Sequence, residues 1–207
     1  MRLIANRADI EAGLAGLLVL EPRFAQALAV VEEVPLRRKA GGFGDLLDAI
    51  ISQQVSVASA AAIAARMRAA GLWEGTAIAA ASDEDLRAVG LSRPKMRYVR
   101  ALAGAALDYG ALAVLSDSEV VARLTAIAGI GRWSAEVYLL QSLGRADVFP
   151  AGDLALQESA RVLFGMQARP SEREMRALAA GWAPQRAIAA RLLWAYYGGM
   201  KKREGIR

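Results

Sequence analysis

Apolar residues recur at three- and four-residue spacing along almost the whole chain, and no stretch alternates convincingly between apolar and polar residues. The first spacing places apolar side chains on one face of an α-helix, whereas alternation would indicate a strand. Short clusters rich in glycine, proline and serine interrupt the spacing at regular intervals. We therefore predict an all-α fold of about ten helices joined by short loops.

Capping residues predict where several of these helices begin. Asp9 is a plausible N-cap for the first helix, and Ser92 for a helix that runs to about Tyr109. Residues 43–70 read as one long helical region, which a break near Ser56 would divide in two.

The composition limits the chemistry that this chain can perform. Its 207 residues are 55% apolar and 23% charged, which is typical of a folded chain. It contains no cysteine and no histidine. Disulfides, thiolate or imidazole metal sites, and Ser-His or Cys-His nucleophile pairs are thus excluded. Acid–base catalysis would have to come from carboxylates, lysine, tyrosine or water.

No part of the sequence indicates a membrane segment or a secretory signal. The longest uncharged run, residues 49–65, contains two glutamines and three serines and is too short to span a bilayer. We expect a soluble, intracellular and cytoplasmic protein. The net charge of +5 and pI near 9.9 fit either an ordinary solvated surface or a polyanionic partner.

The stretch LTAIAGIGRWS contains two glycines between two predicted helices. Gly129 and Gly131 allow a sharp reversal and close approach of another backbone, while Ile130 can turn inward. The next helix begins near Arg132, and the N–H groups at a helix start favour a phosphate. A dinucleotide-binding loop is excluded because the third glycine and the preceding strand are missing. An ordinary helical hairpin remains an alternative.

Further motifs accompany this turn: FGDLLDAIISQQVSVASAAAIAARM, VGLSRPKMRYVRALA, VFPAGD and WAPQRAIAARLLWAYY. Together they resemble the helix-hairpin-helix (HhH-GPD) DNA glycosylase superfamily, and within it the 3-methyladenine DNA glycosylase II branch. The resemblance covers roughly residues 40–197. It implies one glycosylase domain over residues 1–207, with two helical subdomains flanking a DNA-binding cleft. We expect one subdomain at about 45–152, with the hairpin at 124–143, and the other at about 1–44 plus 153–207.

The resemblance also implies an activity. Members of this branch hydrolyse the N-glycosidic bond of alkylated purines, such as 3-methyladenine and 7-methylguanine, in base excision repair. The expected partner is double-stranded DNA that contains damaged bases, and we expect no membrane partner and a monomer. Two alternatives remain open: a non-enzymatic helix-hairpin-helix DNA-binding protein, and an alanine-rich helical scaffold.

Four residues match the catalytic and base-binding positions of the family. Asp153 matches the catalytic aspartate, whose charge would stabilise positive charge on the sugar. Trp133 and Trp194 match aromatic walls of the base pocket, and Gln53 matches a pocket-lining amide. Each has a structural alternative: Asp153 could simply cap the following helix, the tryptophans could pack in the core, and Gln53 could lie on a helix surface.

The DNA-binding positions come from the same resemblance, from the hairpin turn and from the basic side chains. Gln54 lies where the bacterial type has a leucine that fills the gap left by the extruded base. Lys95 is expected to contact a phosphate. The hairpin should bind the DNA backbone through Gly129, Ile130, Gly131 and Arg132.

No cofactor is expected apart from a monovalent cation, Na⁺ or K⁺, held by the main-chain carbonyls of Thr125, Ile127 and Gly129. Iron–sulfur relatives need four cysteines, which this chain lacks. Lyase-competent relatives carry a Schiff-base lysine at the position of Trp133, so we expect no lyase activity. Val137 departs from the family by replacing an aromatic residue, and the neighbouring Tyr138 should point elsewhere on the helix.

Overall fold

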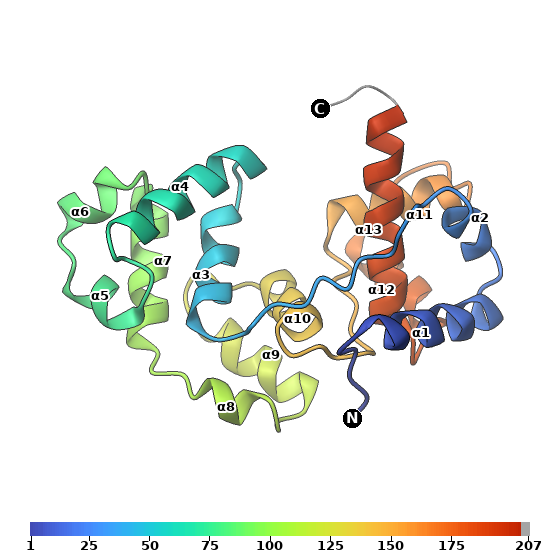
Figure 1. The fold of residues 1–207 in the computed structure, drawn as a ribbon, viewed down its shortest axis with the longest axis horizontal. Coiled ribbons are helices and arrows are strands. Elements are labelled where there is room, and N and C mark those ends of the chain that lie inside the picture. The colour runs from blue at the N-terminus through green and yellow to red at the C-terminus, as the bar shows by residue number, and fades with distance from the viewer. Residues whose placement is uncertain (204–207) are drawn as a thin grey trace. The chain divides into compact units, whose positions relative to one another are not determined.

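The computed structural model describes residues 1–203 of the chain (Figure 1). Within that range the regular elements are all helices, apart from one isolated bridge between Leu3 and Arg145. The predicted all-α fold is confirmed. No helix in the described part has the length and apolar character needed to cross a membrane.

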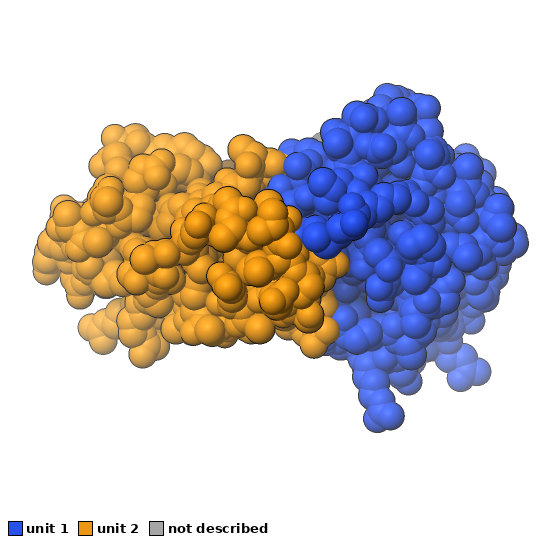
Figure 2. All heavy atoms as spheres, turned by 90° about the horizontal axis from the view of Figure 1, so that it is seen from below, with its two compact units in different colours: residues 1–38, 139–207 blue, residues 39–138 orange. Residues whose placement is uncertain are grey.

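The chain divides into two compact units (Figure 2). Unit 1 comprises residues 1–38 and those from 139 on, and unit 2 comprises residues 39–138. The boundary therefore lies inside one helix, α10 (Arg132–Gln141), and not near residue 152 as expected. The main chain explains the difference, because Ala146 donates to the carbonyl of Arg2 (3.1 Å) and accepts from the amide of Ala187 (3.1 Å).

Unit 1 is built around α13, which packs against α1, α2 and α11 (Figure 1). Its core contains Trp182, only 2% exposed, whose ring lies 5.1 Å from that of Phe24 and 5.4 Å from that of Phe149. Its helices are α1 (Arg7–Leu20), α2 (Phe24–Leu28), α11 (Leu154–Leu163), α12 (Glu172–Ala180) and α13 (Arg186–Arg203).

Unit 2 carries seven helices and the first part of α10. They are α3 (Phe43–Ser52), α4 (Val57–Ala69), α5 (Gly75–Ala80), α6 (Asp83–Ala88), α7 (Arg93–Gly104), α8 (Tyr109–Leu112) and α9 (Asp117–Thr125). The predicted break at Ser56 is confirmed, since its hydroxyl caps α4 through the amide of Ser59.

Two of the predicted boundaries are wrong. Asn6, not Asp9, is the N-cap of α1, and Asp9 instead completes a capping box with it. The helix expected from Ser92 to Tyr109 ends at Gly104. Two residues later Ala106 adopts a positive φ of 44°, which interrupts a helix and allows α8 to start separately.

A buried arginine joins three segments of unit 1. Arg191, on α13, is 0% exposed, and burial lowers its pKa to about 10. Its guanidinium donates to the carbonyls of Leu36 (2.9 Å), Leu140 (3.0 Å) and Ala187 (3.0 Å). It therefore fixes the chain before residue 37 against α13, which also carries Trp194.

The helix-hairpin-helix consists of α9, a short turn and α10. Gly129 adopts a φ of +91°, and an added Cβ would overlap the Cβ and Cγ atoms of Tyr98. Neither constraint applies to Gly131. Its φ lies outside the left-handed region, and nothing lies within 4 Å of an added Cβ. Ile130 is 4% exposed, so it turns inward as expected.

We expect Arg191→Met to lower the free energy of unfolding by about 2–4 kcal/mol, because three buried carbonyls lose a charged donor. Urea denaturation measures the change. Arg186→Met is the control: Arg186 pairs with Asp147 at a half-exposed position, so its loss should cost less than about 1 kcal/mol. Equal losses in the two variants would contradict the anchoring role of Arg191.

The two hairpin glycines should respond differently to alanine. Gly129→Ala should lower the free energy of unfolding by roughly 2–4 kcal/mol, because it adds backbone strain and a clash with Tyr98. Gly131→Ala should change it by no more than about 0.5 kcal/mol. Denaturant melts of the two variants provide the comparison, and a large loss from Gly131→Ala would show that the turn is misread.

Candidate active site and nucleic-acid interface

Asp153 lies at the start of α11, directly after a turn in which its amide donates to the carbonyl of Pro150 (2.9 Å). Its Oδ1 accepts from the amides of Ala155 (3.0 Å) and Leu156 (3.1 Å), so it caps the helix. The side chain is only half-buried. Capping thus holds the carboxylate in one orientation, and its catalytic role stays a prediction.

Trp194 lies on α13 at the edge of the unit 1 core, where it is partly buried. The guanidinium of Arg37 lies over its ring, 5.5 Å from the ring centre. Although Arg37 as a whole is exposed, partial desolvation lowers the pKa of its guanidinium, and the negative charge of Asp153 opposes that shift. Arg37 thus lies over Trp194, and the charge of Asp153 in the same unit acts on it; we refer to these three residues as the candidate catalytic group.

Sequence reasoning missed Arg37. It belongs to the basic run LRRKA at 36–40. This run shows no helical periodicity, so the spacing of its residues indicates no role for Arg37. The residue also adopts a positive φ of 48°, a conformation that only the folded chain reveals.

A cavity of about 430 Å³ opens beside Trp194 in unit 1. The residues that line it include Trp194, Arg37, Glu32 and Glu33. This volume lies within the range of small-molecule sites, roughly 300–1,000 Å³. Trp194 offers an aromatic face that accepts the cation of Arg37.

Asp147 is the other acidic residue of the segment that leads to α11. Arg186 holds both of its carboxylate oxygens, Nε to Oδ1 at 2.7 Å and an Nη to Oδ2 at 2.8 Å. Asp147 is therefore a paired residue. The bidentate pair favours Asp153 over Asp147 as the reactive carboxylate.

In unit 2, Gln53 follows α3 and reaches the hairpin. Its Nε2 donates to the carbonyl of Gly129 at 2.8 Å. The side chain is therefore not a plain surface amide, because it connects the loop after α3 with the hairpin turn. Contact of Gln53 with a base stays a prediction.

Gln54 is exposed and has a φ of 56°. The neighbouring Val55 and Val57 are 39% and 88% exposed, which is unusual for valine. This part of the chain therefore presents one strained polar residue, followed by two exposed valines. Such a loop suits insertion into a nucleic-acid groove, and the wedge role of Gln54 stays a prediction.

Lys95 corrects one expectation. It is 8% exposed, and its Nζ donates to the carbonyl of Ile51 at 2.6 Å. Desolvation lowers its pKa. Its charge satisfies a carbonyl at the C-terminal end of α3, where a cation is favoured, and it is not presented at the surface for a phosphate.

The start of α10 brings two predicted residues together. Arg132 is exposed and its Nε donates to Oε1 of the buried Glu136 at 3.0 Å, while Trp133 is partly buried beside it. Tyr138 is 3% exposed and its hydroxyl accepts from the amide of Gly42 (3.1 Å), so it does point away as expected. Burial raises the pKa of Tyr138. The pocket role of Trp133 stays a prediction.

The expected cation would use three hairpin carbonyls. That of Ile127 accepts from the amide of Ile130 (3.0 Å), and that of Gly129 accepts from Gln53. A carbonyl oxygen has two lone pairs, so these bonds leave room for a weakly bound monovalent cation. In the described range no cluster of three or more acidic residues could hold a metal ion.

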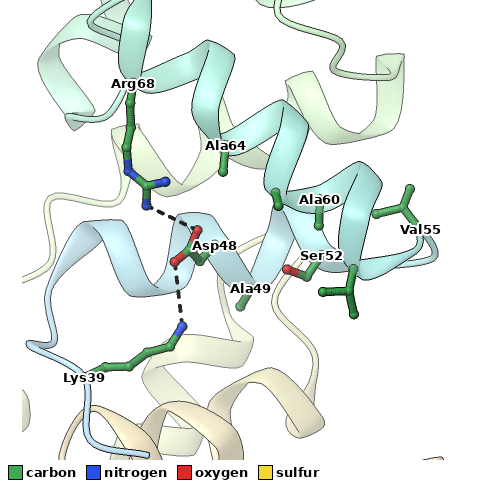
Figure 3. Close-up of a pocket in the computed structure, with 10 residues that line it drawn as sticks. Lys39, Asp48, Ala49, Ser52, Val55, Ala60, Ala64 and Arg68 are labelled. Carbon is green, nitrogen blue, oxygen red and sulfur yellow. Dashed lines mark ion pairs between the residues drawn. The ribbon is translucent and has the colours of Figure 1, made fainter. Parts of the chain in front are cut away.

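A second cavity, of about 390 Å³, lies between α3 and α4 (Figure 3). Asp48 lies between Lys39 and Arg68, 3.7 Å from each, and Arg68 also stacks 3.6 Å from the centre of the Trp73 ring. The carboxylate is therefore charge-compensated.

Comparison with known proteins places these features in a family. The sequence pattern of the HhH-GPD superfamily base excision DNA repair proteins matches residues 47–185. The alkylbase DNA glycosidase-like protein mag2 of Schizosaccharomyces pombe is 34% identical over 116 residues, which are 54% of this chain and 54% of that protein. The chain thus aligns with about half the length of this relative.

Two solved structures are similar over most of the fold. A DNA-3-methyladenine glycosidase from Bacillus halodurans has a TM-score of 0.78 and 31% identity, covering 92% of this chain and 91% of its own. The 3-methyladenine DNA glycosylase Mag1 of Schizosaccharomyces pombe, in complex with abasic DNA, has a TM-score of 0.80 and 29% identity, covering 88% and 95%. These names confirm the predicted branch, and the chain belongs to the HhH-GPD superfamily of base excision DNA repair proteins.

Proposed function

We propose that this protein is a DNA glycosylase that removes alkylated purines from duplex DNA by hydrolysing the N-glycosidic bond. The observation that carries the proposal is the group formed by Asp153, Trp194 and Arg37 in unit 1. It combines a fixed carboxylate with an aromatic ring that already accepts a cation. Relatives named as 3-methyladenine glycosylases support the same reaction.

Asp153 would act on the sugar. Breaking the glycosidic bond leaves positive charge on the sugar ring, and a carboxylate held nearby stabilises that charge. The two amides of α11 that bind Oδ1 keep the carboxylate oriented before the reaction begins. The same group can accept a proton from the attacking water.

The leaving base needs little help if it is already cationic. Alkylation of a ring nitrogen places positive charge on the purine, so no strong general acid is required to protonate it. This fits a chain without histidine. A cationic ring would also gain about 0.5–2 kcal/mol from stacking on tryptophan.

DNA would be held by the hairpin, with main-chain amides of Gly131 and the start of α10 facing a phosphate. A monovalent cation on the hairpin carbonyls would add positive charge to that contact. The base must leave the helix stack to be reached, and the exposed loop at Gln54 would fill the space that it leaves.

The first test is excision of alkylated bases by Asp153→Asn. Asparagine caps a helix as well as aspartate does, so the fold should survive while single-turnover excision of 7-methylguanine falls at least about 100-fold. Asp108→Asn is the matched control, because Asp108 caps α8 through the amide of Ala111 (2.9 Å) and should leave excision unchanged. Full activity in Asp153→Asn would remove Asp153 from the mechanism. A wild-type protein that binds DNA without any excision would favour the non-enzymatic alternative.

The product should be an abasic site in an unbroken strand. Trp133 stands where lyase-competent relatives have lysine, and the adjacent Arg132 is too basic to act as an amine nucleophile. Borohydride reduction during turnover should therefore trap no covalent complex, with a lyase-competent glycosylase as the positive control. A trapped complex would show that another amine forms an imine with the sugar.

Cationic lesions should be preferred to neutral ones. We expect faster excision of 7-methylguanine or 3-methyladenine than of uracil or 8-oxoguanine, and Trp194→Leu should reduce this preference by a factor of about 2–30, as 0.5–2 kcal/mol implies. Single-turnover rates on duplexes that carry each lesion measure it. Faster release of uracil than of 7-methylguanine would refute this assignment of the pocket.

A further inference from the structure

Arg37 covers the Trp194 ring, on which the proposed substrate would stack. Its guanidinium lies 5.5 Å from the centre of the Trp194 ring, and both residues line the same cavity. Because a cationic purine would bind the same ring for the same electrostatic reason, guanidinium and base compete for it.

The backbone beside Arg37 is held, although the residue as a whole is exposed. Arg191 binds the carbonyl of Leu36 at 2.9 Å and lies on the same helix as Trp194, one turn before it. Arg37 itself has a φ of 48°, which a residue with a side chain adopts only when its surroundings impose it. The side chain can therefore change direction without movement of the main chain.

A DNA phosphate offers this guanidinium a better partner than an aromatic ring. Arginine binds phosphate through two parallel charge-assisted hydrogen bonds. If Asp153 faces the sugar of the extruded nucleotide, the phosphates of that nucleotide lie only a few bonds away from it. Asp153 lies in the same unit and its negative charge acts on Arg37, so a phosphate bound beside Asp153 would attract the same guanidinium.

We propose that Arg37 is a gating residue: it covers Trp194 in the free protein and turns to a backbone phosphate when DNA binds, which uncovers the ring for the base. The inference rests on the proposed function, because it assumes that Trp194 receives the extruded base. It couples two events, since the base site opens only when the backbone is engaged. Coupling of this kind acts equally in both directions.

Removal of the guanidinium should therefore have opposite effects on two ligands. In Arg37→Gln, the affinity for a duplex with a tetrahydrofuran abasic analogue should fall, and the slope of log K against log salt should decrease by about one. The affinity for free 7-methylguanosine, in slightly acidic buffer that keeps its ring cationic, should instead rise at least about threefold. Calorimetry or fluorescence titration measures both.

Two further variants separate gating from structural support. Arg37→Lys keeps the charge without the planar group, so the salt slope should stay near that of the wild type, with nucleoside affinity between those of the wild type and Arg37→Gln. Arg23→Gln removes another cation of unit 1 that lies over an aromatic ring, 4.5 Å from the centre of Phe164, and should change neither affinity.

The outcomes are distinct. Opposite changes in Arg37→Gln support gating, whereas a fall in both affinities, or no change in nucleoside affinity, overturns it. Wild-type excision of 7-methylguanine is measured separately. If the wild type shows no excision while Arg37→Gln still changes the two affinities in opposite directions, the proposed reaction is refuted but the gating role of Arg37 is supported.

Discussion

The buried guanidinium of Arg191 is the interaction on which the candidate catalytic group depends. A charge inside a protein is unfavourable unless its hydrogen bonds are satisfied. Here three main-chain carbonyls satisfy them, and they come from the segment before residue 37, from the end of α10 and from α13 itself. The hydrogen bond from Arg191 to Leu36 holds the neighbouring Arg37 beside Trp194. The need to satisfy a buried charge in the core therefore also determines how Arg37 and Trp194 are arranged at the surface.

Unit 2 uses main-chain groups in a comparable way. The side chain of Gln53 binds the carbonyl of Gly129, and Lys95 binds the carbonyl of Ile51 at the end of α3. Both bonds fix the short loop between α3 and α4, whose exposed residues include Gln54 and Val55. If this loop enters a nucleic-acid groove, as we propose, such support lowers the conformational entropy that is lost on binding.

The chemistry and the composition are consistent with each other. A chain without histidine has no side chain that titrates near neutral pH in its unperturbed form, so a reaction that required a strong general acid would suit it poorly. A carboxylate oriented by a helix N-terminus and an indole face can stabilise positive charge without proton transfer. The proposed substrates are cationic bases, whose release needs stabilisation of positive charge but no strong general acid.

The amino-acid sequence by itself determined the helical class, most of the helix starts, the hairpin and the family, because periodicity and capping involve residues only a few positions apart. Thus Ser56 divides α3 from α4, and Asp153 caps α11. The tertiary structure decided what each polar side chain contacts. Lys95 is buried against Ile51, Gln53 reaches Gly129, and Arg37 lies over Trp194. These partners are far apart in the chain, and only the packing of the helices brings them together, so no local pattern could reveal them.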